Sequence, residues 1–218
     1  MIKGLIFDLD GVIVDTAKYH YKAWKDLAAE LGFEFTEKDN EQLKGVSRMT
    51  SLDILFKTGN ISGVSEAEKL KMAESKNKQY VSYVDKMEPG EILPGALKIL
   101  SEAKNKGLKV ALGSASKNAV RILKRVEIES YFDAIIDGTK VKKAKPDSEV
   151  FLKGAEAMGL KPEECIVFED AQAGIEAAKA GNFHAVGIGD ENILKDADYI
   201  LPGFVSIDIS EIINTLNT

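Results

Sequence analysis

The fold is decided by the stretch Leu5-Ile6-Phe7-Asp8-Leu9-Asp10-Gly11-Val12. Its apolar run is typical of a buried parallel strand, and the run ends in two aspartates one residue apart. Side chains two positions apart in an extended segment point the same way. We therefore expect Asp8 and Asp10 side by side at the carboxyl end of a strand, where open α/β sheets bind ligands. Taken alone, the pair could equally be a turn that caps a helix.

The composition is that of a globular protein. The chain has 218 residues, 44% of them hydrophobic and 29% charged, which suits one large or two modest domains. The formal net charge of −6 argues against general nucleic-acid binding, because such binding depends on basic surfaces. The single cysteine, Cys165, cannot form an internal disulfide, which fits a reducing cytoplasm. The sequence has no signal-peptide pattern and no apolar stretch of membrane-spanning length, so we expect no membrane partner.

Helical periodicity begins soon after the aspartate pair. Apolar residues recur every three or four positions between residues 15 and 31, and Gly32 follows as a natural stop. Helical or loop segments continue to about residue 84. A strand followed by about seventy mainly helical residues predicts a helical insertion over residues 15–84 into a core of residues 1–14 and 85–218.

Helices and short apolar runs alternate through the rest of the chain. Such alternation predicts an α/β fold with a Rossmann-like parallel sheet covered by helices on both faces. The predicted strands are 108–112, 134–136, 165–168, 184–188 and 199–201. The predicted helices are 96–106, 118–126, 148–158, 171–180 and 207–216.

Polar residues follow the second predicted core strand. Ser114, Ser116, Lys117 and Asn118 lead from it into a helix. Backbone N–H groups at a helix N-terminus, together with hydroxyl groups, can bind an anion. A simple N-cap would give the same pattern.

Charged residues stand at two further junctions. Lys145 precedes a helix, where a lysine is usually solvated. Glu169 and Asp170 end the strand that begins at Cys165, and Gly174 would let the next helix sit close to them. The acidic pair could also be only a helix cap.

Together, these strand-end residues resemble the four motifs of the haloacid dehalogenase superfamily of phosphotransferases: Asp8-x-Asp10, Ser114, Lys145 and Glu169-Asp170. The resemblance spans the whole chain and implies that residues 15–84 form a helical cap domain, with hinges near residues 14–16 and 84–92. It implies that Asp8 is a nucleophile that becomes an aspartyl phosphate and that Asp10 is the general acid and base. It also implies a Mg²⁺ ion held by Asp8, the backbone carbonyl of Asp10, Glu169 and Asp170. Ser114 and Lys145 would contact the transferring phosphoryl group.

Cap residues narrow the resemblance to the β-phosphoglucomutase group of that superfamily. The matching positions are Thr16, His20, the stretch Leu43-Lys44-Gly45-Val46-Ser47-Arg48, the pair Lys76-Asn77 and the segment 114–118. The resemblance implies that Thr16 and His20 belong to the catalytic site, with His20 linking cap closure to the placement of Asp10. The residues implied in substrate binding are Gly45, Val46, Ser47, Arg48, Lys76, Ser116, Lys117, Asn118 and Trp24.

Each of these cap residues has a structural alternative. His20 could be a surface histidine, Trp24 a packing residue of the cap, and Lys76 a solvated lysine. Arg48 is the best suited to grip a distal phosphate, because a guanidinium binds phosphate through two parallel hydrogen bonds.

The function implied by the resemblance is that of an isomerase of carbohydrate metabolism. It would interconvert β-glucose 1-phosphate and glucose 6-phosphate through β-glucose 1,6-bisphosphate, with Mg²⁺ as cofactor and small sugar phosphates as its partners. A sugar-phosphate or phosphoglycolate-like phosphatase is the alternative, and a non-catalytic phosphosugar-binding protein is a third hypothesis. We expect a monomer in the cytoplasm.

Overall fold

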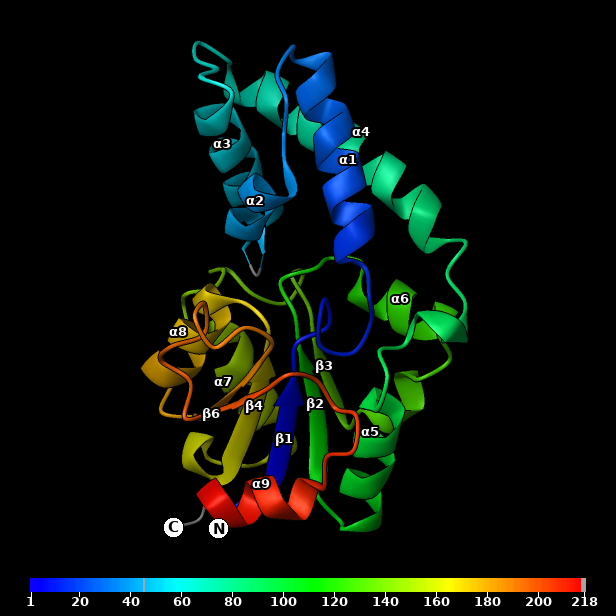
Figure 1. The fold of residues 1–218 in the computed structure, drawn as a ribbon, viewed down its shortest axis with the longest axis vertical. Helices are drawn as coiled ribbons and strands as arrows, with labels where there is room; N and C mark the ends of the chain where they lie inside the picture. The colour runs from blue at the N-terminus through cyan, green and yellow to red at the C-terminus, as the bar shows by residue number, and fades with distance from the viewer. Residues whose placement is uncertain (45, 217–218) are drawn as a thin grey trace.

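The computed structural model describes residues 1–44 and 46–216, so Gly45 of the predicted substrate loop lies outside the described residues. Its centre is a six-stranded parallel sheet with the strand order β3-β2-β1-β4-β5-β6 (Figure 1). The predicted core strands are confirmed to within one residue, and the first strand ends at Phe7, directly before the aspartates. The strands are β1 (Gly4–Phe7), β2 (Lys109–Gly113), β3 (Ala134–Ile136), β4 (Cys165–Glu169), β5 (His184–Ile188) and β6 (Tyr199–Leu201).

The two faces of the sheet are both covered, because alternate residues of a strand point to opposite sides. Leu5 and Phe7 belong to one hydrophobic cluster and Ile6 to the other. The first cluster includes residues of α5 (Ala96–Asn105), α6 (Ala119–Arg125) and α9 (Ile209–Leu216), and the second includes residues of α7 (Glu149–Met158) and α8 (Gln172–Ala180). This two-sided burial explains the continuous apolar run of β1. The predicted α/β fold is confirmed, with helix bounds within two residues of those expected.

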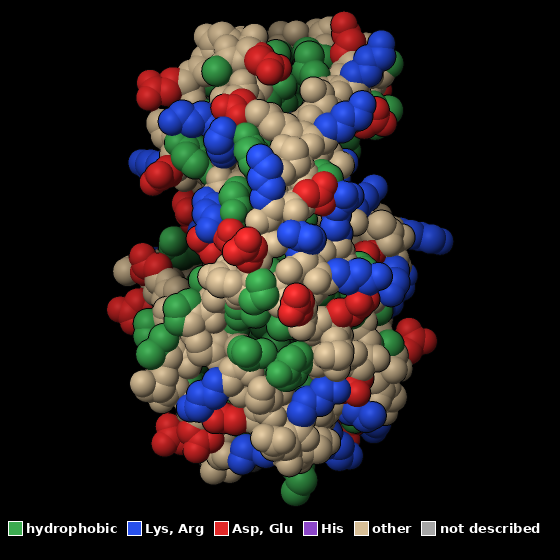
Figure 2. Space-filling model, turned by 90° about the vertical axis from the view of Figure 1, so that its right-hand side faces the viewer, with side chains coloured by type: hydrophobic (Ala, Val, Ile, Leu, Met, Phe, Trp, Pro, Cys, Tyr) green, Lys and Arg blue, Asp and Glu red, His purple; other side chains and the backbone are tan. Residues whose placement is uncertain are grey.

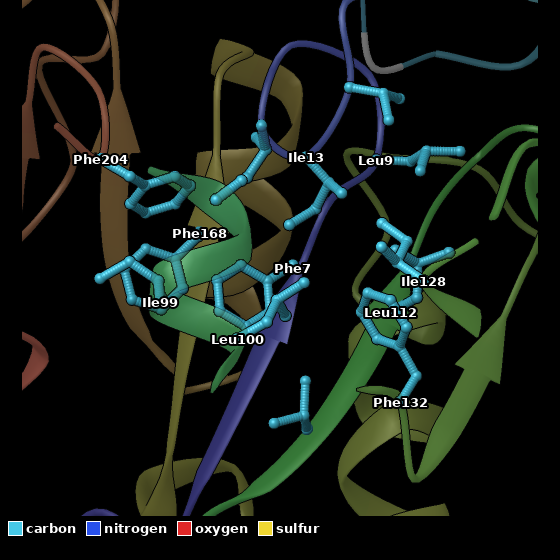
Figure 3. Close-up of a cluster of buried hydrophobic side chains, with 14 of the residues drawn as sticks. Phe7, Leu9, Ile13, Ile99, Leu100, Leu112, Ile128, Phe132, Phe168 and Phe204 are labelled. Atoms are coloured by element: carbon cyan, nitrogen blue, oxygen red, sulfur yellow. The ribbon is translucent and has the colours of Figure 1, made fainter. Parts of the chain in front are cut away.

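Aromatic packing fixes the upper ends of β1 and β4. The rings of Phe7 and Phe168 stack with centroids 4.8 Å apart, and Phe204 meets both rings edge-on (Figure 3). All three side chains are buried. Since Asp8 and Glu169 directly follow Phe7 and Phe168, this packing holds the backbone from which both carboxylates project.

A second group of helices lies beyond the carboxyl ends of the strands (Figure 1). We call these elements the cap helices: α1 (Ala17–Glu30), α2 (Glu37–Asn40), α3 (Arg48–Thr58) and α4 (Glu66–Val84). They have a hydrophobic cluster of their own, which includes Trp24, Leu55 and Phe56. Helix α1 starts two residues later than predicted, because Thr16 stands at its N-cap.

The two chain segments that join the cap helices to the sheet run side by side. Val14 and Ile92 form an isolated antiparallel bridge, and the N–H of Asp15 donates to the carbonyl of Glu91 at 3.1 Å. The carboxylate of Glu91 accepts hydrogen bonds from Lys18 and Tyr19 at 2.6 Å each. The predicted hinge segments therefore contact each other, whereas hinge motion itself stays a prediction.

Short 3₁₀ turns complete the described structure, at Glu41–Leu43, Pro89–Glu91, Glu129–Tyr131 and Pro162–Glu164. Among the described helices, none combines the length and the apolar character needed to cross a membrane. Basic and acidic side chains are interspersed on the face that carries α6 (Figure 2).

Candidate active site

Asp8 and Lys145 form a buried ion pair at the carboxyl end of β1. The Nζ of Lys145 lies 2.6 Å from Oδ1 of Asp8 and 2.9 Å from Oε1 of Glu169. Burial disfavours the charged lysine, but the carboxylates of Asp8 and then Glu169 outweigh it and raise the pKa of Lys145. The alternative of a solvated lysine is therefore wrong, and Lys145 stays a cation beside Asp8.

Three carboxylates face one another beside this lysine. Oxygen atoms of Asp8, Glu169 and Asp170 lie within 4.8 Å of one another, which is close enough to hold one metal ion. Burial, and then the negative charge of Asp8, raise the pKa of both Glu169 and Asp170. The raised pKa values indicate that one lysine does not fully offset the repulsion among these three carboxylates. A divalent cation with a preference for oxygen ligands fits the remaining negative charge.

Two glycines let the acidic cluster form. A Cβ atom at Gly174 would lie 1.7 Å from Oε1 of Glu169, so only glycine lets α8 start this close, as the sequence predicts. A Cβ atom at Gly11 would lie 2.1 Å from Oδ2 of Asp170, and Gly11 has a φ of +79°. The turn after β1 can therefore come this close to Asp170 only because residue 11 has no side chain.

Asp10 lies beside Asp8 but in a different environment. Its backbone N–H donates to Oδ2 of Asp8 at 3.1 Å, and its own carboxylate accepts a hydrogen bond from the hydroxyl of Thr16. Burial, and then the charge of Asp8, raise the pKa of Asp10 to about 7. A carboxyl group with this pKa can hold and release a proton at neutral pH.

The turn after β2 presents small polar residues to the same site. Ser114 is 1% exposed, and its hydroxyl oxygen accepts from the N–H of Ser116 at 3.1 Å. The hydroxyl of Ser116 in turn accepts from the N–H of Asn118, which is the N-cap residue of α6. The segment is thus a tight turn that leads into a helix N-terminus, as predicted.

Cap residues complete the walls of a cavity of about 430 Å³. Arg48 is the first residue of α3, after the N-cap Ser47, and donates to Oδ1 of Asn77 at 2.7 Å. Asn118 of the sheet region donates to the same oxygen at 3.0 Å. Predicted site residues from both parts of the chain line the cavity: Asp8, Asp10, His20, Trp24, Val46, Ser47, Arg48, Lys76, Ser114, Ser116, Lys117, Asn118, Lys145 and Asp170.

A buried lysine, Lys76, contacts a half-buried histidine, His20, on the cap side of this cavity. The Nζ of Lys76 lies 2.9 Å from Nδ1 of His20 and 4.2 Å from the centre of the Trp24 ring, and His20 stacks on Tyr80. Burial, and then the charge of Arg48, lower the pKa of Lys76 to about 7. Burial, and then Lys76, lower the pKa of His20 well below its usual value. The alternatives of a solvated lysine and a surface histidine do not fit these contacts, and Trp24 both packs in the cap cluster and lines the cavity.

A family model for haloacid dehalogenase-like hydrolases matches residues 2–182, which is most of the chain. The chain belongs to the haloacid dehalogenase-like hydrolases. The family membership expected from the four motifs is thereby confirmed.

Three similar proteins are informative. The chain is 41% identical to a β-phosphoglucomutase of Bacillus subtilis, over 92% of this chain and 89% of that protein. A crystal structure of β-phosphoglucomutase from Clostridium difficile has a TM-score of 0.95 and 44% identity, and covers 100% of this chain and 98% of that one. A phosphorylated carbohydrates phosphatase of Thermotoga maritima is 31% identical over 99% of this chain and 98% of that protein.

Some neighbours in the site were not predicted to take part from the sequence. The sequence resemblance includes Asn77 only as part of the Lys76-Asn77 pair, yet its side-chain oxygen accepts hydrogen bonds from both Arg48 and Asn118. Tyr80 carries the ring on which His20 stacks. The spacing of residues 76, 77 and 80 on one helix could have placed Tyr80 near Lys76, but no local pattern indicates contacts with α1, α3 and α6.

Proposed function

We propose that this protein is a β-phosphoglucomutase, an isomerase that interconverts β-glucose 1-phosphate and glucose 6-phosphate. The observation that carries the proposal is the presence of two groups of anion-binding donors in one cavity, Ser114 with Lys145 beside Asp8 and Arg48 with Asn118 farther along. A phosphatase needs only the first group. A mutase must bind both phosphates of a sugar bisphosphate, in either orientation, and the similarity to two β-phosphoglucomutases supports this.

The proposed cycle assigns different tasks to the two aspartates. Phosphorylated Asp8 gives its phosphoryl group to the 6-hydroxyl of β-glucose 1-phosphate, while Asp10 accepts the hydroxyl proton. The resulting β-glucose 1,6-bisphosphate turns round and returns its other phosphoryl group to Asp8. Asp10 protonates the departing C1 oxygen, and glucose 6-phosphate is released. Ser114 and Lys145 donate to the transferring phosphoryl group throughout.

We propose Mg²⁺ as the ion of the acidic cluster, held by Asp8, Glu169, Asp170 and the backbone carbonyl of Asp10. A set of carboxylate and carbonyl oxygens suits this ion. When bound there, Mg²⁺ would supply positive charge that offsets the negative charge of the phosphoryl group during transfer.

The cap helices would keep water away from phosphorylated Asp8. We propose that residues 15–84 form a cap domain that closes on the core of residues 1–14 and 85–218. Thr16 would bring Asp10 into place on closure, because its hydroxyl donates to Asp10 at the start of α1. His20 would couple the same movement to Lys76. The residues proposed to surround the sugar and its distal phosphate are Trp24, Val46, Ser47, Arg48, Lys76, Ser116, Lys117 and Asn118.

A product assay tests this function against the phosphatase alternative. The protein is given β-glucose 1-phosphate, Mg²⁺ and a trace of β-glucose 1,6-bisphosphate, with the α-anomer in a parallel reaction. We expect glucose 6-phosphate from the β-anomer and little inorganic phosphate. Rapid release of inorganic phosphate in place of glucose 6-phosphate would contradict the proposal. The monomeric state and the cytoplasmic location stay predictions.

A further inference from the structure

Asn77 joins the two residues proposed to bind the distal phosphate. Its side-chain oxygen accepts one hydrogen bond from Arg48 at 2.7 Å and another from Asn118 at 3.0 Å. Arg48 belongs to cap helix α3 and Asn118 begins helix α6 beside the sheet, so one oxygen on α4 ties donors from both sides of the cavity. Because a guanidinium has no acceptor, the oxygen of the Asn77 amide must face Arg48.

These two contacts leave the donors free to bind a ligand. An arginine carries five N–H donors and a side-chain amide carries two. The side-chain oxygen of Asn77 accepts one N–H from each donor, which restricts the directions in which the remaining N–H groups of Arg48 and Asn118 point. Arg48 is partly buried, and burial lowers its pKa because it disfavours the charged guanidinium. A hydrogen bond to a fixed acceptor offsets part of this cost. Arg48, Asn118 and Asn77 all line the cavity.

We propose that Asn77 is a positioning residue that aims Arg48 and Asn118 at the distal phosphate of a bound sugar phosphate. This inference rests on the proposed function, in which those two side chains bind that phosphate. Because Asn77 already orients both side chains, phosphate binding costs less side-chain conformational entropy. It also holds Arg48 of the cap helices and Asn118 of the sheet region in fixed positions relative to each other before the substrate binds.

The neutral amide of Asn77 suits this task better than a carboxylate. An aspartate at this position would still accept both hydrogen bonds, but it would pair with the Arg48 cation and repel a phosphate dianion. The proposal therefore predicts that Asn77→Asp weakens binding at least as much as Asn77→Ala. A residue that only stabilised the cap would tolerate the aspartate, since both hydrogen bonds remain.

The test measures the binding of glucose 6-phosphate and the kinetics with β-glucose 1-phosphate in the full-length chain. For Asn77→Ala we expect a roughly ten-fold higher dissociation constant and KM, with kcat within about two-fold of wild type, as for the loss of one or two hydrogen bonds. Phosphorylation of Asp8 by acetyl phosphate, which has no distal phosphate, should stay within about two-fold of wild type. Gln79→Ala is the matched control, because the amide of Gln79 lies on the same helix and donates to Asp26 within the cap helices.

Two results with Asn77→Ala would overturn the proposal. One is glucose 6-phosphate binding by Asn77→Ala that equals wild type, and the other is an equal loss of acetyl phosphate reactivity, which would indicate a general defect. Binding by Asn77→Asp that equals wild type would also contradict it. The binding measurement needs no turnover, so a wild-type protein that binds glucose 6-phosphate but forms none from β-glucose 1-phosphate would refute the proposed function and not the role of Asn77.

Discussion

Lys145 Nζ lies 2.6 Å from Asp8 Oδ1, although 137 positions separate the two residues in the chain. Both side chains are buried, and the same ammonium group also contacts Glu169. A buried cation placed between two carboxylates keeps them close without full repulsion. It also provides a positive charge at the carboxylate that the proposed mechanism phosphorylates.

Replacing this lysine should stop phosphoryl transfer. In Lys145→Met we expect the single-turnover rate of Asp8 phosphorylation to fall by roughly 100-fold or more, because the transferring group loses a fixed positive charge. The fold should persist, since methionine has a similar length and still packs beside Phe151, whose ring centre lies 4.7 Å from the lysine nitrogen. Rapid-quench measurement of the phosphoenzyme gives the rate, and circular dichroism reports the fold.

The matched control is Lys124→Met, which removes an exposed lysine that pairs weakly with Glu129. It should phosphorylate Asp8 at the wild-type rate. A near wild-type rate in Lys145→Met would show that the buried lysine is not needed for transfer.

Asp10 should matter for proton transfer and much less for attack by Asp8. In Asp10→Asn we expect interconversion of the sugar phosphates to fall by about 10²- to 10⁴-fold, the usual range for a general acid and base. Acetyl phosphate, whose leaving group needs no proton, should still phosphorylate Asp8. A coupled assay for glucose 6-phosphate and a phosphoenzyme assay separate the two steps. Interconversion at the full rate by Asp10→Asn would disprove the division of tasks between Asp8 and Asp10.

The acidic cluster predicts stabilisation by Mg²⁺. An ion that binds the native state and not the unfolded chain raises the unfolding temperature. We expect a higher thermal midpoint in millimolar Mg²⁺ than in a chelator, and a much smaller difference in Asp170→Asn. Asp190→Asn, a change in an exposed aspartate on a different loop, serves as the control. If Mg²⁺ shifted the midpoint of wild type and Asp170→Asn equally, the ion would bind elsewhere.

Local sequence patterns predicted the sheet and its ends well, for a physical reason. Leu5, Ile6 and Phe7 are all buried because β1 is covered on both faces, so their apolar run is unambiguous. Since the carboxyl ends of parallel strands meet at one edge, the polar residues after β1 and β4 had to come together. The closeness of Asp8 and Glu169 follows from this topology, whereas Lys145 reaches them from the segment between β3 and α7.

The cap side of the site was harder to predict. Lys76 was expected near the substrate only through the family resemblance, and its contacts with His20 and Trp24 depend on how α4 packs on α1. The link from Asn77 to Asn118 depends on the placement of the cap helices over the sheet. No local periodicity encodes either arrangement, because both arise from tertiary packing. The role of Gly45 lies outside the described residues.

Lys76 should reduce stability in a pH-dependent way. Its side chain is 4% exposed, and burial followed by the charge of Arg48 lowers its pKa from 10.5 to about 7; the nearby groups also include His20, Tyr80 and Asp10. Between these two pKa values the unfolded chain binds the proton and the folded chain does not, so the contribution of Lys76 becomes more favourable as pH rises. The burial of Lys76 therefore lowers the free energy of unfolding by its full amount below about pH 7 and no longer lowers it above about pH 10.5.

Lys76→Met should accordingly raise the free energy of unfolding at pH 6.5, and the gain should shrink at pH 9.5. Urea denaturation at the two pH values measures it, with the exposed Lys78→Met on the same helix as a control. Equal stability of Lys76→Met and wild type at pH 6.5 would mean that the contacts with Trp24 and His20 fully offset the burial of the charge.

The fate of the phosphoryl group on Asp8 tests the central claim most directly. The protein is phosphorylated with radiolabelled acetyl phosphate, freed of excess donor, and mixed with buffer alone or with β-glucose 1-phosphate, and the labelled products are separated after rapid quenching. We predict that the label moves quickly into sugar phosphate when the sugar is present and leaves Asp8 slowly when only water is available. Label that appears as inorganic phosphate at the same rate in both mixtures would contradict the account.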